Sequence, residues 1–244
     1  MKKYLKILFW LVVAGALLMC SVEAIKQYRD DRYIQALADE IVSKAGAKTP
    51  RERIVALREY ILANVRYQGA AYYNRPFLRA TATETLQSGL GYCGEVTRAF
   101  INLAGAVDIR AQRINLWGKD PHVVAEAEIG LGNLVIVDCQ MPPKVKELER
   151  LDRVILQPEF DDYYTFNLRR MRLEGMVSRV RTSIGPLTYW FENPHALMAA
   201  FWGLLAISLT SGWFLTKGIR NIVRAFLLKR GWVHKTAIPG SAGH

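Results

Sequence analysis

Two uninterrupted apolar runs lie near the two ends of the chain. Residues 7–22 and residues 196–216 contain no charged side chain. A helix needs roughly 20 apolar residues to cross the hydrocarbon core of a membrane. The second run has this length, and the first is somewhat shorter. The pattern predicts an N-terminal anchor in residues 1–22 and a transmembrane helix in residues 196–216.

The first run also has the features of a cleaved signal peptide. Three lysines precede it, and the sequence that ends at Ala24 is an acceptable cleavage site. Cys20 is a poor lipoprotein site because Met19 stands where a small residue is expected. For residues 196–216 the alternative is a buried core helix, although little chain follows to bury it.

Between the two runs, the hydrophobic pattern changes from helical spacing to strand-like segments. Thr49 and Pro50 have the types expected at a helix N-cap and first turn, and apolar residues recur on one face from Ile54 to Val65. Residues 70–92 are expected to form a loop. The other expected elements are helices at residues 31–45 and 93–106 and strands at residues 110–117, 122–129 and 133–139. Helices followed by consecutive strands predict an α+β fold with an antiparallel sheet.

Basic residues indicate which side of the membrane each part occupies. The formal net charge is +11. Nine basic residues and no acidic residue lie in the two terminal segments, residues 1–6 and 217–244. Removing these nine from the 33 basic residues leaves 24 against 22 acidic ones, so nucleic acid is not an expected partner. Six basic residues follow the second run, and basic flanks are typical of the cytoplasmic side. We therefore expect both termini in the cytoplasm and residues 23–195 in the periplasm. Cleavage after Ala24 would leave the domain on the same side.

The stretch GLGYCGEV, residues 89–96, contains a cysteine in an unusual setting. Cys93 lies among three glycines at the expected start of a helix. A helix N-terminus has unpaired N–H groups and a partial positive charge, which stabilise a thiolate. Cys93 is therefore a candidate nucleophile, and the alternative is a cysteine that only packs at a helix start.

A cysteine nucleophile needs a general base, and the base needs an orienting group. His122 is the one histidine inside the domain, at the start of an expected strand, and Asp138 ends the next strand. If the hairpin is centred near Gly130, these two residues lie opposite each other, although the register can slip by two. The alternative is a structural histidine.

These residues resemble the transglutaminase-like superfamily of papain-like cysteine enzymes. Cys93 in GYCGE, His122 in HVVAE and Asp138 in VIVDC have the order and spacing of its triad, and Glu126 is the glutamate four residues after the histidine. The resemblance covers roughly residues 49–140. The sequence departs from the pattern at Val124, where an aromatic residue is usual, and at Cys139, where proline often follows the aspartate.

The resemblance implies an α+β, papain/transglutaminase-like core, with the nucleophile at a helix N-terminus packed on an antiparallel sheet and two transmembrane helices flanking it. It also implies acyl transfer at an amide bond without a cofactor or metal. Cys93 would attack the carbonyl carbon, His122 would transfer the proton, and Asp138 would hold the imidazole. One oxyanion donor would be the Cys93 N–H, and Gln87 is a candidate for the second by proximity alone. Peptidase or amidase activity and transamidation both remain open, with a protein or peptide of the cell envelope as substrate.

Three alternatives to the enzyme remain open at this stage. Cys93, His122, Asp138 and Cys139 include residue types that bind zinc, but paired metal-ligand spacing is absent. A Cys93–Cys139 disulfide is conceivable outside the cytoplasm. The domain could also be a non-catalytic binding or scaffolding module of an envelope assembly, with a vestigial triad.

The remaining segments suggest membrane contacts. Tyr189, Trp190 and Phe191 precede the second apolar run and resemble an interfacial aromatic belt. Five arginines between Arg169 and Arg181 indicate either a surface for lipid headgroups or an acidic polymer, or a solvated helix face. After the run, apolar residues with helical spacing lie opposite Arg220 and Arg224, which predicts an amphipathic helix that lies on lipid or docks another membrane protein. The expected divisions are an N-terminal anchor or signal peptide (1–22), a transglutaminase-like core with leading helices (23–143), a juxtamembrane extension (144–195), a transmembrane helix (196–216) and a basic amphipathic cytoplasmic tail (217–244).

Overall fold

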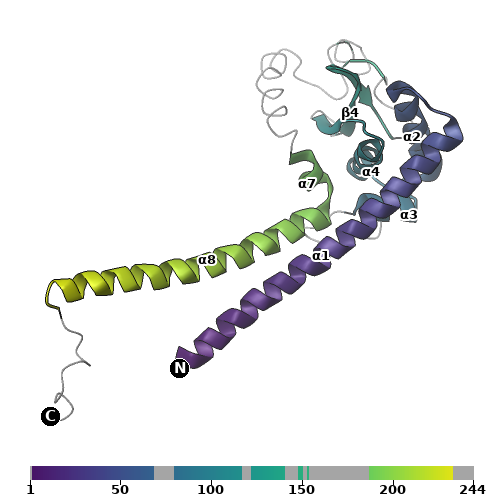
Figure 1. Ribbon diagram of the computed structural model, residues 1–244. Coiled ribbons are helices and arrows are strands. Elements are labelled where there is room, and N and C mark those ends of the chain that lie inside the picture. The colour runs from purple at the N-terminus through teal and green to yellow at the C-terminus, as the bar shows by residue number, and fades with distance from the viewer. Residues whose placement is uncertain are drawn as a thin grey trace. The chain divides into compact units, whose positions relative to one another are not determined.

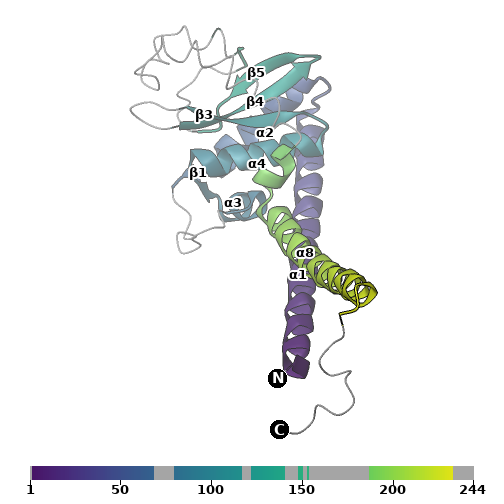
Figure 2. The same cartoon turned by 90° about the vertical axis from the view of Figure 1, so that its left-hand side faces the viewer.

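The chain divides into two compact units. One is Ala24–Leu197, and the other is Met1–Glu23 together with Met198–His244. We call the first unit the domain and the second the apolar helix pair (Figures 1 and 2). The computed structural model describes residues 2–68, 80–116, 122–140, 148–150, 153 and 187–232.

The first helix, α1 (Lys2–Ala45), is continuous through the first apolar run and residues 31–45. The helix predicted at residues 31–45 is present, as the last part of α1. No glycine or proline interrupts residues 16–45, so nothing in the backbone ends the helix between them. In this part of α1, Ile34 and Ala38 are buried in the core of the domain.

The second helix, α2 (Pro50–Asn64), begins where the sequence predicts. The Thr49 hydroxyl accepts a hydrogen bond from the N–H of Glu52, and the Glu52 carboxylate accepts one from the N–H of Thr49. This reciprocal capping box satisfies backbone donors that a helix start leaves unpaired. The predicted apolar face, from Ile54 to Ile61, is fully buried.

The predicted loop at residues 70–92 is wrong for its second half. That half contains helix α3 (Ala82–Ser88) and the short strand β2 (Leu90–Gly91), while residues 70–79 lie outside the described part of the chain. A capping box of Thr81 and Glu84 starts α3, and the Thr-x-x-Glu spacing was visible in the sequence. The helix is too short for its apolar periodicity to be recognised.

The predicted antiparallel sheet is confirmed. It has the order β3 (Ala111–Leu116), β4 (His122–Gly130), β5 (Asn133–Val137), and both pairings are antiparallel. A separate parallel pair joins β1 (Arg66–Tyr67) to β2. Because β4 and β5 are antiparallel and joined by one hairpin, the start of β4, with His122, and the end of β5, next to Asp138, lie at the same end of the sheet.

Helix α4 (Cys93–Ala106) occupies the centre of the domain. It packs against β3 and β4 on one side and against α2 and α3 on the other. Figure 2 shows the sheet lying over α4 and α2. Phe100 and Leu103 of α4 are fully buried in one cluster with Leu57 of α2 and Val137 of β5. The helix that begins at Cys93 is therefore held on both sides by the hydrophobic core.

The apolar helix pair consists of the first part of α1 and most of α8 (Pro194–Lys229). Val13 and Ala16 pack with Ala206, and the rings of Phe9 and Trp213 stack with centroids 4.8 Å apart. Both helices are long and apolar enough to cross a membrane. Little of either apolar window is buried, which argues against a core helix in residues 196–216.

The predicted amphipathic tail helix is the end of α8 and not a separate element. The helix continues unbroken from the apolar run to Lys229. The predicted aromatic belt lies in the short helix α7 (Thr188–Glu192) and is exposed from Tyr189 to Phe191. The arginine segment from Arg169 to Arg181 lies outside the described residues.

The buried face of α2 gives a test of the core. Leu57→Ala should lower the free energy of unfolding by about 2–5 kcal/mol, because it leaves a cavity between α2 and α4. Leu131→Ala is the matched control, since Leu131 is fully exposed in the turn between β4 and β5, and it should change stability by less than about 0.5 kcal/mol. Chemical denaturation of the full chain in detergent measures both, and equal effects would contradict the packing described.

Candidate active site

Cys93 is the first residue of α4, as predicted. Tyr92 is the N-cap residue, and the Glu95 carboxylate accepts a hydrogen bond of 2.9 Å from the N–H of Tyr92. At this first position a backbone N–H has no acceptor within the helix. The partial positive charge of the helix end lies next to the Cys93 side chain.

Two glycines allow the sharp turn that precedes Cys93. Gly89 has a φ of +64°, in the left-handed region that favours glycine, and ends α3. Gly91 packs closely, since a Cβ there would lie 3.0 Å from Cγ2 of Thr85. A side chain at either position would displace the turn that delivers Cys93 to the helix start.

The structure brings His122 and Asp138 into direct contact. Nε2 of His122 lies 2.9 Å from Oδ2 of Asp138, and both side chains are almost completely buried. His122 is the first residue of β4, and Asp138 follows the last residue of β5. Nε2 is therefore the ring nitrogen that faces the carboxylate, and Nδ1 is on the opposite side of the ring.

The register explains how this pair forms despite an offset. Ala125 is paired with Val137, so extending the ladder by one residue places Asp138 opposite Val124. His122 is therefore two residues away from the position directly opposite Asp138. A shift of two keeps both side chains on the same face of the sheet, at the diagonal spacing that long side chains bridge. The hairpin is centred one residue later than predicted, which shifts the register by two, but the predicted proximity is present.

The sulfur of Cys93 has three hydrogen-bonding neighbours. They are the imidazole of His122, the backbone N–H of Val123 and the backbone N–H of Gly94. All three favour the negative charge of a thiolate. Cys93, His122 and Asp138 thus lie together where the N-terminus of α4 meets one end of the sheet.

These contacts shift the pKa values of Cys93 and His122. Burial alone would raise the pKa of the Cys93 thiol, but the hydrogen bond and charge of His122, with the two N–H groups, outweigh burial and lower it. Burial likewise disfavours a charged His122, yet the hydrogen bonds and charges of Asp138 and Cys93 raise the pKa of its imidazole to about 9. Near neutral pH these opposite shifts favour a thiolate paired with an imidazolium.

Asp138 is held in place by its own neighbours. Its Oδ1 accepts a hydrogen bond of 2.9 Å from the N–H of Gln140, and its backbone carbonyl accepts one of 3.0 Å from Nε of Arg58 in α2. The carboxylate therefore has one oxygen fixed by the backbone and the other directed at His122. This arrangement orients the imidazole ring.

Tyr67 was not recognised from the sequence as a neighbour of Cys93. It is paired with Gly91 in the two-residue parallel bridge, and its ring contacts Tyr92 with centroids 5.3 Å apart. Partial burial raises the pKa of the Tyr67 hydroxyl, and the charges of Cys93, Tyr92 and Asp138 add to this. No local signal in the sequence identifies a strand pair as short as β1 and β2.

The other residues singled out in the sequence have different positions. Gln87 is exposed on α3. Cys139 is buried in the hydrophobic core, and no disulfide joins it to Cys93. Glu126 is buried on β4 and accepts a hydrogen bond of 2.7 Å from Nε2 of Gln112 on β3, so it ties the two strands together. In the part of the chain that the structure describes, no group of three or more His, Cys, Asp or Glu is arranged to hold a metal.

Comparison with known proteins identifies the class of the domain. Residues 35–139 match the family model described as the Transglutaminase-like superfamily. The match covers most of the described core and includes Cys93, His122 and Asp138. Residues 35–139 are therefore transglutaminase-like, and the resemblance and the α+β fold predicted from the sequence are confirmed.

Two solved structures are similar to about half of the chain. A "Putative Cysteine Protease from Cytophaga hutchinsonii" shares 24% sequence identity over 47% of this chain and 39% of its own, with a TM-score of 0.41. A "putative protease" from Parabacteroides distasonis shares 12% identity over 51% of this chain and 29% of its own, with a TM-score of 0.36. The chain thus spans well under half the length of either protein. No curated protein matches it.

The reactivity of Cys93 tests the electrostatics of the site. At pH 6, iodoacetamide should alkylate Cys93 faster than it alkylates glutathione in the same solution, because the lowered pKa supplies thiolate where an ordinary thiol is protonated. His122→Ala should slow this reaction about tenfold or more by removing the imidazolium. Mass spectrometry of the peptide that contains Cys93 gives the rates. A wild-type rate equal to that of glutathione, unchanged by His122→Ala, would show an ordinary thiol.

Proposed function

We propose that this protein is a membrane-anchored cysteine enzyme that acts on amide bonds by acyl transfer through Cys93, His122 and Asp138. One observation carries the proposal: a thiol at a helix N-terminus contacts an imidazole, which in turn contacts a buried, oriented carboxylate. Nucleophile, base and orienting group are the three parts that this chemistry needs. The transglutaminase-like class of the domain supports the same interpretation.

In the first half of the reaction, the Cys93 thiolate attacks the carbonyl carbon of the amide. A C–S bond forms, and the carbonyl electron pair moves to oxygen. The unpaired N–H of Cys93 at the start of α4 is suited to stabilise this oxyanion, and such a donor contributes roughly 3–4 kcal/mol in related chemistry. The His122 imidazolium gives its proton to the leaving amine as the C–N bond breaks, which leaves a thioester on Cys93.

In the second half, neutral His122 removes a proton from the acceptor, which attacks the thioester and releases Cys93. Water as acceptor gives hydrolysis, and an amine gives transamidation. Asp138 keeps its hydrogen bond to Nε2 throughout, so that Nδ1 faces the reacting atoms. Proteins or peptides of the cell envelope are the substrates that fit an extracytoplasmic domain.

We further propose that both termini are cytoplasmic and that the domain is periplasmic. The two long apolar helices and the basic residues at both chain ends support this orientation. The exposed amphipathic end of α8, which includes Arg220 and Arg224, is suited to contact lipid headgroups or another membrane protein.

A model acyl donor tests the catalytic proposal without knowledge of the substrate. p-Nitrophenyl acetate should give a burst of p-nitrophenol and one acetyl group on Cys93, detected by mass spectrometry. Asp138→Asn should slow the burst by up to about 10⁴-fold, as expected when the imidazole loses its orienting partner. Cys20→Ala is the control, since this cysteine lies outside the domain, and should acylate normally. Acetylation that is indifferent to Cys93→Ala would instead favour a non-catalytic module.

Reporter fusions test the orientation. Alkaline phosphatase fused after residue 150 should be active and the same enzyme fused at residue 244 inactive, because it folds only outside the cytoplasm. A cytoplasmic fluorescent reporter at the same two positions should give the opposite pattern. Phosphatase activity at residue 244 would contradict the proposed topology.

A further inference from the structure

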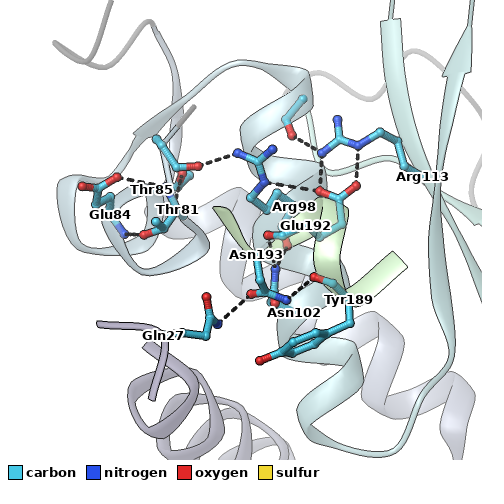
Figure 3. A network of polar contacts seen from close by, with 12 residues as sticks. Gln27, Thr81, Glu84, Thr85, Arg98, Asn102, Arg113, Tyr189, Glu192 and Asn193 are labelled. Carbon is cyan, nitrogen blue, oxygen red and sulfur yellow. Dashed lines mark hydrogen bonds and ion pairs between the residues drawn. The ribbon is translucent and has the colours of Figure 1, made fainter. Parts of the chain in front are cut away.

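A buried ionic network surrounds Glu192, the last residue of α7 (Figure 3). Its carboxylate is 4% exposed and accepts two hydrogen bonds of 2.6 Å from Arg113, one from Nε and one from Nη2. Nε of Arg98 lies 3.3 Å from the same carboxylate. Figure 3 shows Glu192 between the two guanidinium groups. A side chain just before α8 thus neutralises charge inside the domain.

Each arginine also donates a hydrogen bond to a backbone carbonyl near Cys93. Nη2 of Arg113 donates a hydrogen bond of 2.8 Å to the carbonyl of Gly94, the residue after Cys93. Nη1 of Arg98 donates one of 2.6 Å to the carbonyl of Ala80, next to the N-cap of α3. The two guanidinium groups therefore hold the first turn of α4 and the start of the helix that leads to it.

Glu192 is itself fixed from both sides. Nδ2 of Asn102 in α4 donates a hydrogen bond of 3.3 Å to the Glu192 carbonyl. The side chain of the next residue, Asn193, accepts one of 3.1 Å from Gln27 in α1, and Gln27 also accepts one from the N–H of Ala196. These contacts leave the carboxylate little freedom to follow Arg113 if that side chain moves. The position of Arg113 is therefore set by Glu192.

The Glu192 carboxylate compensates the charges of two buried guanidinium groups, those of Arg98 and Arg113. Without the carboxylate, the buried charges of Arg98 and Arg113 would repel each other. Each side chain would then move toward another hydrogen-bond acceptor. The two-point contact also fixes the plane of the Arg113 guanidinium, which a single contact does not. That plane determines whether Nη2 reaches the Gly94 carbonyl.

We propose that Glu192 is a positioning residue of the active site, which acts through Arg113 on Gly94 and so on Cys93. Gly94 supplies one of the N–H groups that contact the Cys93 sulfur, so a displaced first turn weakens the stabilisation of the thiolate. The inference rests on the proposed function, because a positioned nucleophile matters only if Cys93 reacts. The chain that enters α8 then carries a residue on which the nucleophile depends.

The test uses two variants and a matched control in the full chain. Glu192→Gln removes the charge and the two-point contact, while Arg113→Lys keeps the charge but removes the planar group that reaches Gly94. Glu128→Gln is the control, because Glu128 pairs with Arg110 at 3.7 Å on the same sheet, and Arg110 is largely exposed. The alkylation rate of Cys93 at pH 6 and the melting temperature are measured for each.

We expect both Glu192→Gln and Arg113→Lys to slow alkylation about tenfold and Glu128→Gln to leave the rate unchanged. The direction of the rate change in Glu192→Gln distinguishes two effects. If the uncompensated positive charge of Arg113 acted only through space, it would stabilise the thiolate and make alkylation faster. Wild-type or faster alkylation in both variants, with a lower melting temperature, would show that Glu192 only ties α7 to the domain. If Glu192→Gln does not fold, Arg113→Lys decides alone. A wild-type Cys93 no faster than glutathione would overturn the proposed function and this inference together.

Discussion

The packing of α4 between the sheet and α2 is the constraint on which the site depends. The helix buries Phe100 and Leu103 along its length, so its axis and its rotation are fixed by the core. Cys93 is the first residue of this helix, so the packing of the helix determines its position. The position of Cys93 therefore does not depend on a rigid loop, and the glycines before it provide the turn that precedes the helix.

The second constraint is that several ionisable side chains near Cys93 are buried and need partners. His122 and Asp138 are buried at one end of the sheet, and Arg98 and Glu192 are buried where α7 meets α4. Each group is tolerated because a partner and further hydrogen bonds accompany it. Both sets meet at the first turn of α4, where Gly94 contacts the Cys93 sulfur with its N–H and Arg113 with its carbonyl. The electrostatics of the site therefore extend beyond Cys93, His122 and Asp138.

The two long apolar helices are connected to the domain without a long linker in the chain. α1 has no break between its apolar part and the part that packs in the core, and one residue separates α7 from α8.

Local signals in the sequence determined much of this structure. Thr49 and Pro50 start α2, Cys93 starts α4, and the three strands and their order follow from short apolar segments and turns, because each depends on residues that are close in the chain. Even the His122–Asp138 contact could be predicted, since one hairpin joins them and a register shift of two preserves the face. The helix α3 was missed although its capping box was present, because seven residues show no clear periodicity.

Only the tertiary structure decided the rest. Glu192 is 94 residues from Arg98 and 79 from Arg113, and no pattern in the sequence distinguishes these three from the many charged residues that remain in solvent. Tyr67 likewise reaches Cys93 through a strand pair of two residues. Periodicity and caps are properties of neighbouring residues, whereas the pairing of buried charges depends on which distant surfaces the core brings together.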